Sequence, residues 1–532
     1  MGTGTRATPR PAPRWFGRRR LGSRWLNSQR RQRGGAWFIY LLIALSVTWP
    51  FLLGPYGAGV GFLHRDMAVI DQPRMTLTAL GLSSAARAAP QDGALALLAA
   101  AGGGFIPATA WVRAGMVGAA VAGAWAGRRL GGYPGALMVV FNPLVVERLL
   151  QGHWSFVIAV WLLPAVWVLA TGPRGRGRWA LVAAIWACTT SPTGAVLVVV
   201  LLLVACVATR RAPHTGPRAR PAAVALALML CLPWLLPSLL APQLSDTSAA
   251  AATAGVRAFA PRAEALAGTL GTVLSLGGLW NAQAAPASRE LGLTLVGAAL
   301  GVLCVVRLLR GRAWALAVLV GLGVGGALVG AALATAAPQA LGAAMAQVPA
   351  LQLFRDSHKL TALAVPGYAW AVGALARDLQ AATRLGPRAA GALLCAVVVA
   401  ALPDGAAAVA PLRPVRYHFP AQLVATGAPA WQPVAVPGGV LVRVRGVPTV
   451  RPEDKAWTLE LSRELVVDGQ GVDAPAAPPR PFPAGSPPRA YALLVAVHVG
   501  WLAVGAAAGA AGVLSLMRGV YARRGRRSRV VS

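Results

Sequence analysis

The sequence predicts an all-α integral membrane protein with about 12 transmembrane helices. Its 532 residues are 56% hydrophobic and only 12% charged, and the mean hydropathy is +0.59. Soluble proteins average about 45–50% apolar and about 25% charged residues, so the soluble class is excluded. The apolar residues gather in long runs, and arginines gather at both ends and between alternate runs. Both patterns are typical of a multi-pass protein.

The membrane spans follow from the apolar runs in order. A bilayer-spanning helix needs about 20 mostly apolar residues. The predicted spans are 36–54, 114–130, 132–147, 154–171, 179–190, 192–209, 221–241, 291–309, 313–334, 359–376, 388–403 and 490–516. A shorter run, 93–108, predicts an interfacial or re-entrant helix.

The N-terminal tail sets the orientation of these spans. Residues 1–35 carry ten arginines and precede the first span without a convincing cleavage site. This pattern predicts an uncleaved start-transfer helix with a basic cytoplasmic tail. The domains are then the tail 1–35, a transmembrane domain 36–403, an extracytoplasmic segment 404–489, the last helix 490–516 and a basic tail 517–532. We therefore expect a plasma-membrane protein with both termini in the cytoplasm.

The charge distribution agrees with this orientation. The segments assigned to the cytoplasm hold 31 basic residues and one acidic residue, Asp378, out of 50 and 16 in the chain. An excess of arginine in cytoplasmic segments is the positive-inside pattern. It accounts for most of the net charge of +34 without a nucleic-acid partner. Membrane lipids are expected partners instead, since basic tails favour anionic inner-leaflet lipids.

The outer segments hold 15 of the 16 carboxylates, so chemistry that needs a carboxylate is expected there. Two long outer loops are 55–113 and 242–290. The segment 404–489 is rich in Pro and Gly, and alternation over Val440–Val447 and Thr458–Val467 makes a small sheet plausible. The five cysteines all lie in apolar runs, so neither structural disulfides nor a zinc site is expected.

The first polar motif follows the first span. It contains Arg65 and Asp66, with Asp71 five residues after Asp66. A carboxylate beside an arginine can act as a base while the cation holds an anion. The alternative is an ordinary polar loop, which the local sequence alone favours.

The second motif is the string Asn142–Trp154, which contains Glu147, Arg148 and His153. Charged residues inside a membrane are costly and usually face a cavity or an interface. Asn142-Pro143 also interrupts the helix. A cavity lining and an interfacial turn held by a Glu–Arg pair are equally compatible with these residues.

The third motif is Phe354–Lys359, just before the tenth predicted span. Arg355, His358 and Lys359 can converge on one anion at a helix start, and a phosphate or pyrophosphate headgroup is the matching ligand. The alternative is a solvated helix start in which Asp356 favours the positive helix end. Ser191–Gly194 reads as a tight outer turn.

Taken in order, these strings resemble a family of actinobacterial polytopic membrane proteins related to GT-C glycosyltransferases. The strings are Asn142–Trp154, Ser191–Gly194 and Phe354–Lys359, with Leu232-Pro233-Trp234 and Arg87–Asp92 as further matches. The resemblance extends over about residues 36–400. It implies a GT-C-like fold and a sugar donor carried on polyprenyl phosphate, with transfer on the outer face to a cell-envelope glycan or lipid.

The resemblance also implies roles for single residues. Asp66 is expected to be the base or a metal ligand, with Asp71 as second choice, and Arg355, His358 and Lys359 to hold the donor phosphate. Arg65, Glu147, Arg148 and His153 are expected to line the cavity. The family pattern has two adjacent acids where this chain has Arg65-Asp66, so no metal ligand is assigned and a divalent cation stays open.

Two other functions remain open. One is a transporter or flippase of an envelope lipid. Breaks in the predicted helices support it, but the sequence shows no repeat of one half in the other, which many transporters have. The other is a non-catalytic membrane scaffold. The polar residues gather at the outer interface, which favours surface chemistry, and glycosyl transfer is therefore the leading expectation.

Overall fold

The computed structural model describes most of the chain. The described residues are 18–82, 89–172, 177–210, 219–240, 249–348, 351–352, 355–419, 433–435, 441–445, 447–450, 455–456, 458–460, 464–467, 470–473 and 489–528. Among the residues and segments named above, Arg87, Ala88, Phe354, Val440, 446 and 461–463 lie outside the described residues, as do the ends of both basic tails.

Helices make up 74% of the structure and strands 4%, which confirms the helical class. The first helices are α1 (Arg18–Leu52), α2 (Gln91–Ala101), α3 (Ala108–Val140), α4 (Pro143–Leu150), α5 (Trp154–Thr171), α6 (Arg178–Cys188), α7 (Pro192–Arg210), α8 (Ala219–Met229), α9 (Leu232–Leu240) and α10 (Ala249–Ala258). The later ones are α11 (Gly268–Leu274), η2 (Ala282–Ala284), η3 (Ala287–Arg289), α12 (Thr294–Arg310), α13 (Trp314–Val320), η4 (Gly321–Gly325), α14 (Gly326–Ala336), α15 (Pro338–Gln347), η6 (Ser357–Ala364), α16 (Val365–Ala382), α17 (Pro387–Ala400), α18 (Gly405–Ala408), η7 (Ala410–Leu412) and α20 (Arg489–Ser528).

Six helical stretches among the described residues are long and apolar enough to cross a membrane. They are Gly35–Leu52, Ala108–Leu150, Trp154–Thr171, Pro192–Thr209, Trp314–Ala336 and Arg489–Gly512. Two bent pairs raise the number to eight: Pro221–Met229 with Leu232–Leu240, bent by 51°, and Pro387–Ala400 with Gly405–Leu412, bent by 50°. These helices are what a multi-pass membrane protein requires, and the number 12 stays a prediction.

The longest of these stretches is a helical hairpin. Gly131 and Gly132 have non-helical backbone angles, and Gly132 has a φ of +69°, which suits glycine. A Cβ on Gly123 would lie 3.2 Å from Cγ1 of Val139, sixteen residues later. In a straight helix these residues would be about 24 Å apart, at 1.5 Å per residue. The chain therefore turns back between the two predicted spans 114–130 and 132–147.

The centre of the bundle is α5, packed against both α3 and α16. Its sequence is apolar on every side, and it is buried from Trp154 to Trp167, with Trp161 fully buried. Small residues allow α3 and α16 to approach closely: a Cβ on Gly131 would lie only 1.8 Å from the carbonyl oxygen of Ala369.

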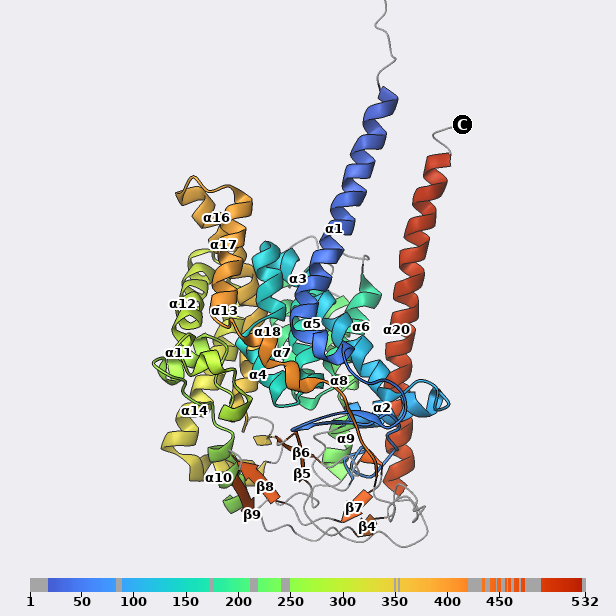
Figure 1. Cartoon of the computed structure of the whole chain (residues 1–532), viewed down its shortest axis with the longest axis vertical. Helices are drawn as coiled ribbons and strands as arrows, with labels where there is room; N and C mark the ends of the chain where they lie inside the picture. The colour runs from blue at the N-terminus through green and yellow to red at the C-terminus, as the bar shows by residue number, and fades with distance from the viewer. Residues whose placement is uncertain are drawn as a thin grey trace, which may run out of the picture.

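The two terminal helices extend beyond the bundle at the same end of the molecule (Figure 1). These helices are α1, drawn in blue, and α20, drawn in red. The short strands lie at the opposite end, where the connections after α1 and α17 meet. The N-terminal end of α1 and the C-terminal end of α20 thus lie on one side of the molecule, and the side of the membrane stays a prediction.

The strands form small sheets. They are β1 (Val60–His64), β2 (Met67–Val69), β3 (Val415–Arg416), β4 (Pro433–Ala435), β5 (Leu441–Val444), β6 (Val447–Val450), β7 (Thr458–Glu460), β8 (Glu464–Val467) and β9 (Gln470–Asp473). The order β2-β1-β3 is antiparallel, with Phe62 opposite Val69 and Val60 opposite Arg416. β5–β6 and β8–β9 are hairpins, and β4–β7 is a parallel pair. The alternating segments predicted within 404–489 thus contain β5, β7 and β8.

Candidate functional site

The short helix α4 begins at a strong N-terminal cap. Asn142 accepts a hydrogen bond from the backbone N–H of Val145 at 3.1 Å, and Pro143 occupies the first turn, where no N–H is needed. Glu147 and Arg148 follow, and both are fully buried. The string is therefore a buried element and not an exposed turn.

The end of α4 packs against the turn between β1 and β2. Gly152 has a φ of +90°, and a Cβ there would lie 2.3 Å from the backbone nitrogen of Met67. The backbone N–H of Asp66 donates to the carbonyl of Gln151 at 3.1 Å. Only glycine fits at this approach, and the contact places Asp66 beside the residues that follow α4.

Arg148 is the centre of a buried polar cluster. Its two terminal nitrogens donate to the carboxylate of Asp356 at 2.6 and 2.7 Å, which is bidentate geometry. Nη2 lies 2.9 Å from Nδ1 of His358, and Nη1 lies 3.4 Å from Nδ1 of His153. Burial opposes ionisation of Asp356, but the charges of Arg148 and Lys359 outweigh it and hold the pKa of Asp356 well below its usual range. The segment 355–359 is thus fastened to α4.

Asp66 lies at the edge of this cluster, with 46% of its side chain exposed. Its Oδ2 accepts from Nε2 of His153 at 3.0 Å and from Nε2 of Gln151 at 3.0 Å. Asn281 in turn donates to Oε1 of Gln151 at 2.8 Å. Desolvation opposes ionisation of Asp66, but these hydrogen bonds and the charge of Lys359 lower its pKa. Among the described residues, the other oxygen of Asp66, Oδ1, has no hydrogen-bond partner.

The three predicted phosphate ligands occupy different surroundings. Lys359 is 20% exposed and lies 3.5 Å from Oδ2 of Asp356. The guanidinium of Arg355 lies 4.2 Å from the ring centre of Phe259. His358 is fully buried behind Arg148, and burial and the charge of Arg148 lower its pKa to about 3. Lys359 and Arg355 thus lie nearer the surface, while His358 contacts the buried side of the cluster.

Asp71 lies apart from Asp66, in a structural position. It is buried, it accepts a hydrogen bond from the hydroxyl of Tyr417, and its Oδ2 accepts from the backbone N–H of Gly59 at 3.0 Å. These bonds join β1 to β3. Arg65, on the turn before Asp66, donates to the carbonyl of Gln283 at 3.0 Å. Its backbone N–H donates to Thr449 and its carbonyl accepts from Val450, so β6 contacts the Asp66 turn directly.

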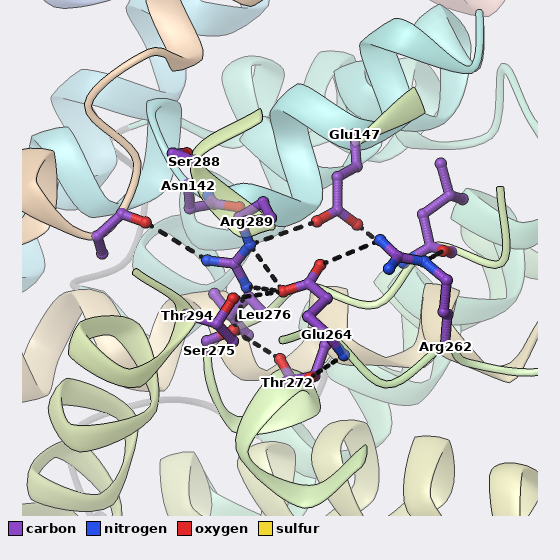
Figure 2. A network of polar contacts seen from close by, with 12 residues as sticks. Asn142, Glu147, Arg262, Glu264, Thr272, Ser275, Leu276, Ser288, Arg289 and Thr294 are labelled. Atoms are coloured by element: carbon purple, nitrogen blue, oxygen red, sulfur yellow. Dashed lines mark hydrogen bonds and ion pairs between the residues drawn. The ribbon is translucent and has the colours of Figure 1, made fainter. Parts of the chain in front are cut away.

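Glu147 points to a second buried network on the other side of α4 (Figure 2). Its Oε2 accepts from the backbone N–H of Leu279 at 2.9 Å. Its Oε1 lies 4.0 Å from Nε of Arg289. Arg289 also contacts Glu264, at 2.8 Å from Nε and 2.6 Å from Nη2, and Thr294 donates to the same oxygen. Glu147, Glu264 and Arg289 have fully buried side chains, so this network holds loop 262–294 against α4.

The sequence did not reveal several of these partners. Asp356 lies at a helix start, just before η6, as predicted, but it is buried and pairs with Arg148. Gln151 belongs to the Asn142–Trp154 string and could have been considered there. The loop 262–294 contains Asn281, Glu264 and Arg289. Their spacing matches no recognised motif, so their contacts with α4 and the residue that follows it could not be predicted from the sequence.

Two small internal cavities, of about 10 and 20 Å³, lie away from Asp66. In the part of the chain that the structure describes, no group of three or more His, Cys, Asp or Glu side chains is arranged to hold a metal ion. Comparisons with protein-family models, with curated proteins and with solved structures give no match.

Proposed function

We propose that this protein is a membrane glycosyltransferase that moves a sugar from a polyprenyl-phosphate donor to a cell-envelope acceptor on the outer face. The observation that supports this proposal is the meeting of Asp66 with the segment 355–359. Asp66 follows the first span, and Lys359 precedes α16, yet His153 and Arg148 join them in one polar cluster. A carboxylate and a lysine thus belong to one partly exposed cluster, and this supports roles as base and phosphate-binding cation.

Asp66 has the features of a general base. Its carboxylate is partly exposed, and one oxygen is held by His153 and Gln151 while the other has no partner among the described residues. The acceptor hydroxyl would give its proton to Oδ1, and its oxygen would attack the anomeric carbon of the donor sugar. The bond between that carbon and the phosphate oxygen would break, and the electron pair would leave with the lipid phosphate.

Lys359 and Arg355 are the groups that would stabilise the leaving phosphate. Burial lowers the pKa of Lys359, with Arg148 and Arg355 acting in the same direction and Asp356 opposing. Lys359 lies 3.5 Å from Oδ2 of Asp356, and Arg355 belongs to the same segment, four residues earlier. A lysine in one cluster with a partly exposed carboxylate, and an arginine on the same segment, suit electrostatic stabilisation of a departing phosphate.

The test is sugar transfer in proteoliposomes with a polyprenyl-phosphate sugar as donor. Asp66→Asn keeps the size of the side chain and removes the base. Since general-base catalysis contributes about 100-fold or more, transfer should fall by at least that factor. Glu290→Gln is the matched control, because Glu290 is an exposed carboxylate outside the cluster, and it should transfer at the wild-type rate. Full activity of Asp66→Asn would contradict the assigned role.

A transporter or flippase of an envelope lipid is the second proposal. It is supported by two spans bent by 51° and 50° and by a π-helical turn, η4, within the span Trp314–Ala336. Interrupted helices are typical of transporters. Movement of a labelled lipid-phosphate sugar between leaflets, without cleavage of the sugar, would favour transport over transfer.

A further inference from the structure

His153 lies between a cation and an anion that both constrain its ring. Nε2 is 3.0 Å from Oδ2 of Asp66, and Nδ1 is 3.4 Å from Nη1 of Arg148. An arginine nitrogen only donates, and an ionised carboxylate only accepts. Nδ1 must therefore accept from Arg148, and the ring proton must lie on Nε2, where it is donated to Asp66.

The other two states of the ring conflict with these neighbours. The opposite tautomer places an N–H of His153 against an N–H of Arg148 and a lone pair against the carboxylate of Asp66. The charged ring also places an N–H against an N–H of Arg148, and the positive charge of Lys359 disfavours the charged ring further. Burial and the charges of Lys359 and Arg148 lower the pKa of His153, although Asp66 acts in the opposite direction. The neutral ring with Nε2–H is the state that suits Arg148, Asp66 and Lys359 together.

Arg148 can impose this state because it cannot turn away. It is fully buried and held by the bidentate contact with Asp356. His358 shows the same preference independently. Its Nδ1 faces Arg148 at 2.9 Å, and its Nε2 lies 3.4 Å from the carbonyl of Leu276, which only accepts. In both histidines beside Arg148, Nδ1 is therefore the accepting nitrogen and Nε2 carries the proton.

We propose that Arg148 is a positioning residue that fixes the tautomer of His153 and thereby orients the carboxylate of Asp66. Arg148 does not touch the reacting groups. His153 and Gln151 together hold Oδ2 of Asp66, which leaves Oδ1 for the acceptor hydroxyl. The catalytic consequence rests on the proposed glycosyl transfer, while the tautomer itself does not.

The first experiment measures the tautomer without any turnover. The protein is prepared with ¹⁵N-labelled histidine in lipid nanodiscs, and the spectrum of His153→Gln assigns the His153 signals by difference. The wild-type ring should be neutral at pH 7 with its proton on Nε2. Arg148→Lys keeps a positive charge beside Asp356. It has one amine nitrogen in place of the two guanidinium nitrogens, both of which contact Asp356 and one of which also contacts His153. This variant should show a mixture of ring states.

A wild-type ring that is charged, or protonated on Nδ1, overturns the proposal without any variant, so the test does not depend on the folding of Arg148→Lys. An unchanged, pure Nε2–H ring in folded Arg148→Lys also overturns it. In either case the result is independent of sugar transfer.

The second experiment compares two replacements of His153 in the transfer assay. Glutamine can donate from Nε2 to Asp66 as the imidazole does, whereas leucine cannot. His153→Gln should therefore be at least about tenfold more active than His153→Leu, while a purely space-filling role predicts no such advantage. If the wild-type protein transfers no sugar, the proposed function fails, and the tautomer measurement still decides the role of Arg148.

Discussion

Replacing Arg289 by methionine is expected to destabilise the folded protein by about 3–5 kcal/mol, the usual cost of removing one partner from a buried ion pair. Arg289 is fully buried and contacts Glu264 at 2.6 and 2.8 Å and Glu147 at 4.0 Å. Methionine fills much of the same volume. It leaves the buried Glu264 and Glu147 without the cation between them, and only the partly exposed Arg262 remains near Glu264, at 3.7 Å. The loss of the close contact causes the destabilisation.

Thermal unfolding in nanodiscs, followed by tryptophan fluorescence, measures this effect. Arg307→Met is the matched control, because Arg307 pairs with Asp378 at a position where the two side chains are 24% and 50% exposed. Exposed pairs contribute about 0–1 kcal/mol, so the control should unfold close to the wild-type temperature.

A double variant tests the physical cause. Arg289→Met combined with Glu264→Gln removes both the cation and the carboxylate that it contacts most closely. It should unfold at a higher temperature than Arg289→Met alone. If Arg289→Met unfolds within the range of Arg307→Met, the network does not hold loop 262–294 as inferred here.

Three further predictions address the site, the topology and the pH dependence. Arg355→Ala combined with Lys359→Ala should weaken binding of polyprenyl phosphate by at least about tenfold, or about 1.4 kcal/mol, without altering membrane insertion; unchanged binding would indicate a solvated helix start. Reporter fusions at both termini should report a cytoplasmic location and a fusion near residue 450 an external one, and the reverse result would overturn the topology. Burial and the charge of Arg65 lower the pKa of His64 from 6.5 to about 4, so the folded state disfavours the proton that the unfolded chain takes up. Stability should therefore fall as the pH is lowered from about 6.5 to about 4, and the fall should be smaller in His64→Gln; an equal fall in both proteins would exclude His64 as its source.

The positions of the helices were predictable where the sequence is apolar throughout. The predicted span 154–171 coincides with α5, because its residues are apolar on every side and suit a buried helix. The chain reverses at Gly131 and Gly132, at the boundary between the predicted spans 114–130 and 132–147, while their number as membrane spans stays a prediction. The ends of the shorter helices were less predictable. The tenth predicted span begins at Lys359, whereas the structure has the 3₁₀ helix η6 there and α16 starts at Val365.

The partners of the charged residues could not be predicted in the same way. The bidentate contact joins Arg148 to a residue 208 positions later in the chain. Local reasoning placed Asp356 at a helix start, where it favours the positive helix end, and did not predict its contact with Arg148; Lys359 lies 3.5 Å from Asp356 as well. Long-range pairing depends on how α4 and the segment 355–359 pack, and no local spacing encodes that packing.

Glu147 and Arg148 fit a cavity lining and an interfacial turn equally well in the sequence, and the structure explains why. Neighbouring residues on a helix point in directions about 100° apart, because one turn takes 3.6 residues. Glu147 therefore meets Arg289 and loop 262–294, while Arg148 meets Asp356 and His153. One residue of the pair belongs to a network that holds a loop, and the other belongs to the cluster that reaches Asp66. A change at Glu147 should thus act first on stability, whereas a conservative change at Arg148 should act first on the state of His153.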